Sequence, residues 1–162
     1  MITFDVLGMP SPQGSKRAFV AKGRAIIKDM GGTKSVAWRD SVSAKALELA
    51  AEHGCLDGPL RLEVLFRFPM PRSRTKAQRA AVYGWKTTAP DSSKLLRALE
   101  DGLQAGGLIT DDARIVEHIV RKVEVVDAWT GAEVQLSKLR PFPSRTQIVS
   151  LPIDQGLFEV SA

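Results

Sequence analysis

The stretch Leu60-Arg61-Leu62-Glu63-Val64-Leu65-Phe66-Arg67-Phe68 decides the fold. Apolar residues stand at every second position, and the positions between them are mostly charged. Because successive side chains of a strand point to opposite faces, this alternation predicts a β-strand with one buried face. Pro69 and Pro71 end it, since proline has no N–H to donate to a sheet. We therefore expect a strand over 60–68 that forms part of the core.

The segments on either side of this strand predict two long helices and several more strands. Short apolar segments bounded by Gly or Pro predict strands, and apolar residues at helical spacing predict helices. Their order predicts an α/β (α+β) sandwich with a single mixed β-sheet of four to six strands and two main helices. The expected strands are 2–7, 18–20, 25–27, 115–126 and 133–136; the expected helices are 92–105 and a helix from Thr33 or Ser35 to Glu52, with Ser35 as N-cap. The basic segment 72–89 is expected to be a mobile loop, although 75–82 has the composition for a helical turn or two.

The composition limits the class of protein. With 162 residues the chain has the length of one domain, which we place at 1–140, followed by a proline-containing tail over 141–162 that we expect to be loosely ordered. Hydrophobic residues make up 44% and charged residues 25%, which excludes wholesale disorder. No apolar run approaches the roughly 20 residues of a membrane-spanning helix, and the first residues lack a signal-peptide pattern. A cytoplasmic protein is therefore expected.

Cysteine and histidine are scarce. Cys55 is the single cysteine, which excludes an internal disulfide and a multi-cysteine zinc site, and we expect it to be a small buried residue. His53 and His118 lack the spacing of a metal site and are given no role. Any metal chemistry is therefore expected to depend on carboxylates.

Charge is segregated along the chain. The net charge is +5, yet the window 61–90 holds seven basic residues and one acidic residue, so the rest of the chain is slightly acidic. A basic segment of this kind favours a polyanionic partner such as nucleic acid, because Lys and Arg bind phosphates without reading bases. The candidate phosphate-binding residues are Lys16, Arg17, Lys22, Arg24, Arg72, Arg74, Lys76 and Arg79.

The acidic residues that need an explanation lie in Pro90-Asp91-Ser92-Ser93-Lys94-Leu95-Leu96-Arg97-Ala98-Leu99-Glu100-Asp101-Gly102-Leu103 and in the Asp111-Asp112 pair that follows. At about 100° per residue, the leucines share one face of the predicted helix, and its charged residues lie on the opposite face. One interpretation is a solvated helix face, with Asp91 as an N-cap and Asp111-Asp112 as a turn.

The other interpretation is a metal site. Neighbouring carboxylates repel each other unless a cation lies between them, and carboxylate oxygens are the ligands that Mg²⁺ prefers. A carboxylate–Mg²⁺ site in a basic protein favours phosphodiester cleavage, because the metal activates water and offsets the charge that develops on the phosphate. From the residues alone, a metal-dependent nuclease and an ordinary surface helix both stay open.

The same stretch resembles the active-site signature of RusA-type Holliday junction resolvases, crossover-junction endodeoxyribonucleases common in phages and prophages. Asp91 stands at the first aspartate of that signature, Arg97 at its basic position, Asp101 at its helix aspartate and Asp111-Asp112 at its Asp-Asp pair. The segment Gly8–Arg17 resembles the opening of the family, and Trp38-Arg39 its first helix. The resemblance covers roughly residues 2–136. It implies a RusA-like fold, a homodimer and nuclease activity on branched DNA.

The resemblance also implies roles for individual residues. Asp91 and Asp112 are expected to be the main Mg²⁺ ligands, with Mn²⁺ as a substitute for the metal. Asp111 and Asp101 are expected either to be further ligands of the metal or to lie directly behind its ligands, and Arg97 is expected to contact the scissile phosphate. Lys122 is expected either to contact a phosphate or to be an ordinary exposed strand lysine.

This sequence departs from the signature at one position. Ser93 stands where the family has its second aspartate, and a neutral hydroxyl is a poor metal ligand. Glu100 lies within about 20° of Ser93 on the helical wheel, two turns along, so we hypothesise that Glu100 or Asp101 replaces the missing ligand.

The sequence is therefore compatible with three functions. The first is a Mg²⁺-dependent endonuclease that resolves four-way junctions by paired cuts, and the second is a catalytically weakened relative that only binds DNA. The third is a basic RNA-binding protein, which would leave the clustered aspartates unexplained.

Overall fold

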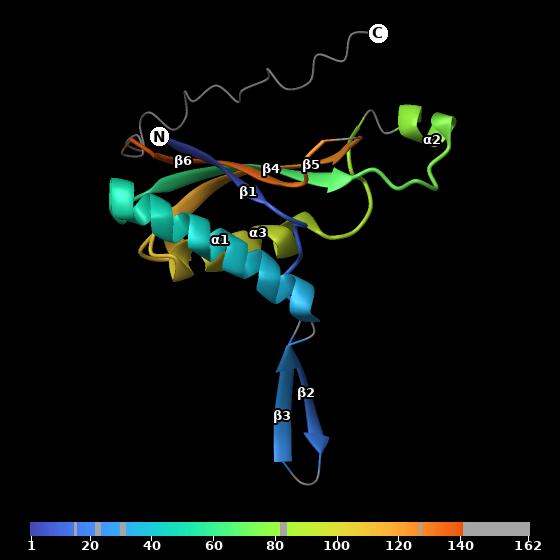
Figure 1. Cartoon of the computed structure of the whole chain (residues 1–162). Coiled ribbons are helices and arrows are strands. Elements are labelled where there is room, and N and C mark those ends of the chain that lie inside the picture. The colour runs from blue at the N-terminus through green and yellow to red at the C-terminus, as the bar shows by residue number, and fades with distance from the viewer. Residues whose placement is uncertain (15, 22–23, 30–31, 82–83, 127, 141–162) are drawn as a thin grey trace, which may run out of the picture.

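The structure, a computed structural model, describes residues 1–14, 16–21, 24–29, 32–81, 84–126 and 128–140. Its elements are β1 (Ile2–Leu7), β2 (Lys16–Ala21), β3 (Arg24–Asp29), α1 (Gly32–His53), β4 (Leu60–Pro69), α2 (Lys76–Ala81), α3 (Ser92–Ala105), the 3-10 turn η1 (Asp112–Arg114), β5 (Ile115–Val125) and β6 (Gly131–Lys138). Four strands form one mixed sheet in the order β1-β6-β4-β5, in which β4 and β5 are parallel and the other pairs are antiparallel. The helices α1 and α3 cover one face of this sheet (Figure 1). The α/β prediction is confirmed.

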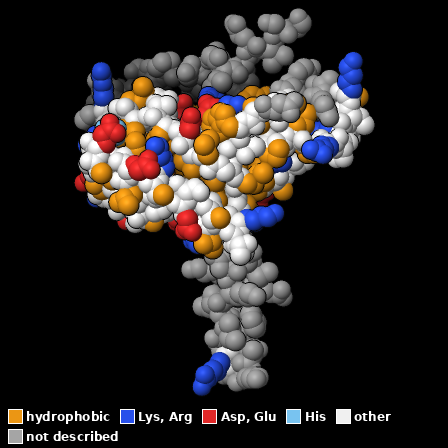
Figure 2. Space-filling model, viewed as in Figure 1, with side chains coloured by type: hydrophobic (Ala, Val, Ile, Leu, Met, Phe, Trp, Pro, Cys, Tyr) orange, Lys and Arg blue, Asp and Glu red, His pale blue; other side chains and the backbone are white. Residues whose placement is uncertain are grey.

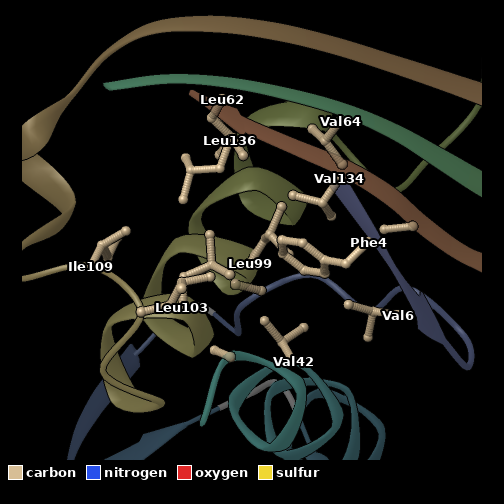
Figure 3. Close-up of a cluster of buried hydrophobic side chains, with 14 of the residues drawn as sticks. Phe4, Val6, Val42, Leu62, Val64, Leu99, Leu103, Ile109, Val134 and Leu136 are labelled. Atoms are coloured by element: carbon tan, nitrogen blue, oxygen red, sulfur yellow. The ribbon is translucent and has the colours of Figure 1, made fainter. Parts of the chain in front are cut away.

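The core lies between the sheet and these two helices. The alternation along β4 predicts the side that is buried, and Leu62, Val64, Phe66 and Phe68 are indeed buried. Figure 3 shows Leu99 and Leu103 of α3 pointing toward strand residues such as Val134. Burial of large apolar side chains is the main stabilising contribution, about 1.5–3 kcal/mol for each. This burial sets the orientation of α3, and so determines which of its side chains face away from the core.

The helices α1 and α3 approach each other closely because α3 carries glycine where they cross. A Cβ atom at Gly102 would lie 2.6 Å from a methyl group of Val42, and one at Gly106 would lie 2.4 Å from the Ser43 carbonyl oxygen. Glycine at these two positions, one helical turn apart, therefore sets the spacing of the helix layer.

The predicted hairpin over 18–20 and 25–27 is confirmed and is longer than expected. The strands β2 and β3 pair with each other and form a separate two-stranded sheet. The hairpin projects from the body of the molecule rather than extending the main sheet (Figure 1). It therefore adds nothing to the core of the main sheet.

Two local predictions are wrong. Ser35 is not the N-cap, because α1 begins at Gly32 and Ser35 lies buried inside its first turns. The segment 76–81 is a short helix, α2, rather than a loop. The Thr75 hydroxyl accepts a hydrogen bond from the Gln78 N–H, and the Gln78 side chain accepts one from the Thr75 N–H. This reciprocal capping box stabilises the helix start.

Cys55 is exposed, so its predicted burial is also wrong. It follows Gly54, which ends α1 with a positive φ of 75°, and the chain turns there along the surface. Among the described residues, no helix has the length and apolar character needed to cross a membrane. The predicted tail 141–162 lies outside the described residues.

Candidate active site

The carboxylate of Asp91 is not used to cap α3. Asp91 has the position and the extended backbone of an N-cap, but its side chain makes no capping hydrogen bond. The side chain is 66% exposed, and its Oδ2 lies 3.6 Å from the ammonium of Lys94. Asp91 is thus the N-cap by position, but its carboxylate does not cap the helix and stays available at the surface.

Asp111 differs from Asp91. Its Oδ1 accepts a hydrogen bond of 2.8 Å from the Ala113 N–H, and this bond starts the turn η1. Asp112 is the first residue of that turn and is exposed. The turn interpretation of the Asp111-Asp112 pair thus applies to Asp111, whereas the Asp112 carboxylate is left for other contacts.

Glu100 is the most deeply placed carboxylate of the site. Its side chain is only 13% exposed, and its Oε1 lies 2.7 Å from His118 Nε2 on β5. Burial raises the pKa of Glu100, and the hydrogen bond and charge of His118 oppose that rise. The negative charges of Asp112 and Asp101 raise the pKa further. Glu100, Asp101 and Asp112 therefore lie close enough to influence one another.

His118 received no role from the sequence, yet it holds Glu100. The two residues are 18 positions apart, on a strand and on a helix, so their spacing along the chain carries no signal. The register of the sheet places His118 beside Leu62 of β4, whose side chain is buried under the helices. His118 consequently faces α3.

Gln13 is a second residue that sequence reasoning passed over, although it lies in the quoted segment Gly8–Arg17. Its amide Nε2 donates to Asp101 Oδ2 at 2.5 Å, and its backbone N–H donates to the Lys94 carbonyl at 3.1 Å. The loop between β1 and β2 is thereby fastened along α3. Asp101 is oriented by this contact.

Lys122 is not an ordinary exposed strand lysine, and its predicted phosphate contact stays a prediction. Its ammonium donates hydrogen bonds to the Pro90 carbonyl at 2.7 Å and to the Thr88 carbonyl at 3.1 Å. These carbonyls belong to the turn that leads into Asp91 and α3. Lys122 is therefore bonded to the backbone beside the site.

The other candidate phosphate-binding residues fall into four groups. Arg24, Arg72 and Lys76 are exposed, whereas Arg74 lies 2.8 Å from the fully buried Glu124 side chain. Lys16 and Arg17 are on β2 and Arg79 is on α2, but the structure describes only their backbone; Lys22 lies outside the described residues. Figure 2 shows Lys and Arg side chains at the end that carries α2 and at the tip of the hairpin. Basic side chains therefore extend beyond the compact body on two sides.

The donor set is suited to a hard cation, although no coordination sphere is assembled. Among the described residues, no group of three or more His, Cys, Asp or Glu side chains is arranged to hold a metal ion. The negative charges of Asp112 and Asp101 nevertheless contribute to the raised pKa of Glu100, and a cation would relieve that repulsion. Ser93 and Arg97 are exposed on the same helix.

Comparison with known families identifies the chain. No match is found among curated proteins. The sequence model of the family described as endodeoxyribonuclease RusA matches residues 9–137, which include the loop of Gln13, all of α3 and the Asp111-Asp112 pair. This match covers most of the chain, and the chain therefore belongs to the RusA family of endodeoxyribonucleases.

Proposed function

We propose that this protein is a Mg²⁺-dependent endonuclease that resolves four-way DNA junctions by paired phosphodiester hydrolysis. The observation that carries the proposal is the Asp91 carboxylate, which caps nothing at the start of α3, together with the carboxylates around Glu100. The membership of the RusA family supports the substrate class. A bacterial or phage-infected cytoplasm is the setting proposed for this activity.

Each acidic residue has a place in this proposal. Asp91 and Asp112 would hold Mg²⁺, with Asp101 and Glu100 completing the oxygen ligands in place of the aspartate that Ser93 replaces. When bound, the metal activates water and offsets charge on the phosphate. Asp111 supports Asp112 through the bond that forms η1. Gln13 keeps the Asp101 carboxylate oriented.

Arg97 contacts the scissile phosphate. Its guanidinium is exposed on α3 and has no hydrogen bond or ion pair with a described residue, so it is free to bind an anion. An arginine stays charged and cannot act as a proton donor, so its role is electrostatic. The exposed basic residues at the hairpin and around α2 follow the phosphates of the arms.

The proposed assembly is a homodimer. Junction resolution needs equivalent nicks in two strands, and a two-fold dimer presents two equivalent sites.

The test uses labelled four-way junctions and linear duplexes, each with Mg²⁺ or EDTA. We expect symmetric paired nicks in the junction only, only with Mg²⁺, and with Mn²⁺ as an active substitute. Cleavage of the linear duplex at a similar rate would overturn the structure-specific proposal.

Ser93 favours one second candidate, a family member that binds junctions without cutting them. Its hydroxyl is neutral and exposed where an acidic ligand is expected. Binding by well-folded protein with no nicks in either metal would support this candidate. If Ser93→Asp then produced cleavage, the missing ligand would be identified as the cause.

A further inference from the structure

Three charged or titratable residues of β5 face the helix layer. The register of the parallel β4–β5 pair places His118 beside Leu62, Lys122 beside Phe66 and Glu124 beside Phe68, and these three β4 side chains are buried under the helices. Paired residues of neighbouring strands point to the same side of a sheet. The side chains of these β5 residues therefore point toward α3 and the turn before it.

Strand β5 contacts α3 near its middle and also contacts the turn that precedes it. His118 contacts Glu100, and Lys122 contacts the carbonyl of Pro90. Four strand residues span about 13 Å, and the eight helical steps from Ser92 to Glu100 span about 12 Å. The matching lengths let one strand support α3 near its middle and the turn before its first residue.

The Lys122 ammonium is committed to this turn. Two of its three protons are donated to the carbonyls of Thr88 and Pro90, which are three and one residues before Asp91. The next residue on the same side, Glu124, reinforces the turn, because its carboxylate lies 3.7 Å from the Lys86 ammonium, which in turn donates to the Thr88 hydroxyl. The backbone of the segment is also paired to β5, where the Lys86 N–H donates to the Lys122 carbonyl.

From this geometry we infer that Lys122 is a positioning residue, which fixes the turn 88–90 so that the Asp91 carboxylate is presented to the metal and the scissile phosphate. It acts through two backbone carbonyls rather than through contact with DNA. The Asp91 carbonyl accepts the Leu95 N–H of α3, but its side chain makes no capping bond, so the preceding turn contributes to the position of the carboxylate. This inference rests on the proposed function for its catalytic consequence, but not for its effect on the turn.

The experiment compares Lys122→Met with Arg121→Met. Arg121 is the preceding residue of β5 and pairs with Leu65, on the other face of the sheet, so its variant is a matched loss of one positive charge. For Lys122→Met we expect about tenfold faster amide exchange in peptides covering 86–95, because two bonds from a charged donor are lost. Under junction saturation we expect kcat to fall about 10–100-fold, the usual effect of losing a partner that orients a ligand. Junction affinity in EDTA should stay within about twofold of the parent protein.

The conservative variant and the DNA measurement separate positioning from other roles. Lys122→Arg keeps a charged donor and should recover part of both the exchange protection and kcat. A phosphate contact predicts instead a uniform loss of affinity, a salt slope lower by about 1 and unchanged exchange; that result would overturn the inference. Equal effects of Lys122→Met and Arg121→Met would also overturn it. Should Lys122→Met fail to fold, Lys122→Gln, which keeps an amide donor, takes its place.

Failure of the proposed function gives a different pattern. If the parent protein cuts no junction, the nuclease proposal fails, but the exchange comparison still decides whether Lys122 holds the turn before Asp91.

Discussion

Two aspartates of this site each precede a helical segment, and they use their carboxylates differently. Asp91 precedes α3, makes no capping bond and is 66% exposed. Asp111 precedes η1, and its carboxylate accepts the bond that forms the turn. The sequence allows Asp91 to be an N-cap and the Asp111-Asp112 pair to be a turn. The comparison distinguishes an aspartate whose carboxylate caps its helical segment from one whose carboxylate caps nothing, and the second is the one we propose for chemistry.

The two aspartates also differ in the contacts that hold them in place. Asp111 is held by its own short turn, whereas Asp91 depends on the turn 88–90 and on Lys122 from β5. A capping residue is local and stabilises its own helix. A residue available for catalysis has to be held by other parts of the fold.

The largest effect is expected for Asp91→Asn. Cleavage should fall by at least about 1,000-fold, equivalent to about 4 kcal/mol, because a charged metal ligand becomes a neutral amide. Thermal stability should change little, since the carboxylate lies only near the exposed Lys94, and such surface pairs contribute about 0–1 kcal/mol. Single-turnover cleavage and a melting curve measure the two quantities. Asp40→Asn, which removes an exposed carboxylate on α1, is the matched control.

A smaller effect is expected for Gln13→Leu, which tests the support of the α3 face on the side of the N-terminal loop. Loss of the bond to Asp101 should lower kcat about tenfold, as is usual for a partner that orients a ligand. The Gln13 backbone bond to Lys94 does not depend on the side chain, so the loop should stay docked. Gln13→Glu would place a second carboxylate against Asp101 and should be worse than Leu. An unchanged kcat in both variants would remove Gln13 from the site.

For substitutions of Asp111, the comparison predicts a lower unfolding free energy rather than a loss of cleavage activity. Asp111→Ala should lower the unfolding free energy by about 1 kcal/mol, the usual cost of losing a cap, and lower Tm by about 2–4 °C. Asp111→Asn keeps an acceptor and should restore most of that stability, with cleavage within about tenfold of the parent. If Asp111→Asn abolished cleavage as completely as Asp91→Asn, the distinction between the two aspartates would be broken.

The sequence was informative where a pattern repeats within one element. The leucines of α3 predict its bounds as 92–105, and the structure confirms them. The alternation of β4 likewise predicts its buried face. Single residues were less informative. Ser35 has the side chain of a good N-cap, yet α1 begins before it. The Thr75–Gln78 pair starts α2, but it lies in a basic segment that the sequence predicts to be a loop. The capping preference of one residue can be overridden by tertiary packing, and the type of that residue does not reveal how it packs.

The partners of the site residues could not be predicted in the same way. His118 and Lys122 contact Glu100 and Pro90 because of the register between β4 and β5 and the path of α3 beside them. Register depends on how two strands far apart in sequence pair, so no spacing along the chain encodes these contacts. The sequence names the acidic residues of α3 as candidates, but it does not predict which side chains contact them.

The smallest effect concerns Glu100, which is neither exposed like Asp91 nor committed to a turn like Asp111. Its pKa is raised, chiefly by burial, so in the folded protein its ionised form is less favourable than in the unfolded chain. That contribution of Glu100 to stability is therefore present below the unfolded pKa and is lost as pH rises through the raised folded pKa. Glu100→Gln removes the titration. In EDTA, the Tm of the variant relative to the parent should rise by a few degrees at most between about pH 4 and pH 7. A pH-independent difference would show that His118 fully compensates the buried charge, and Glu100 would then belong with Asp111 as a structural carboxylate.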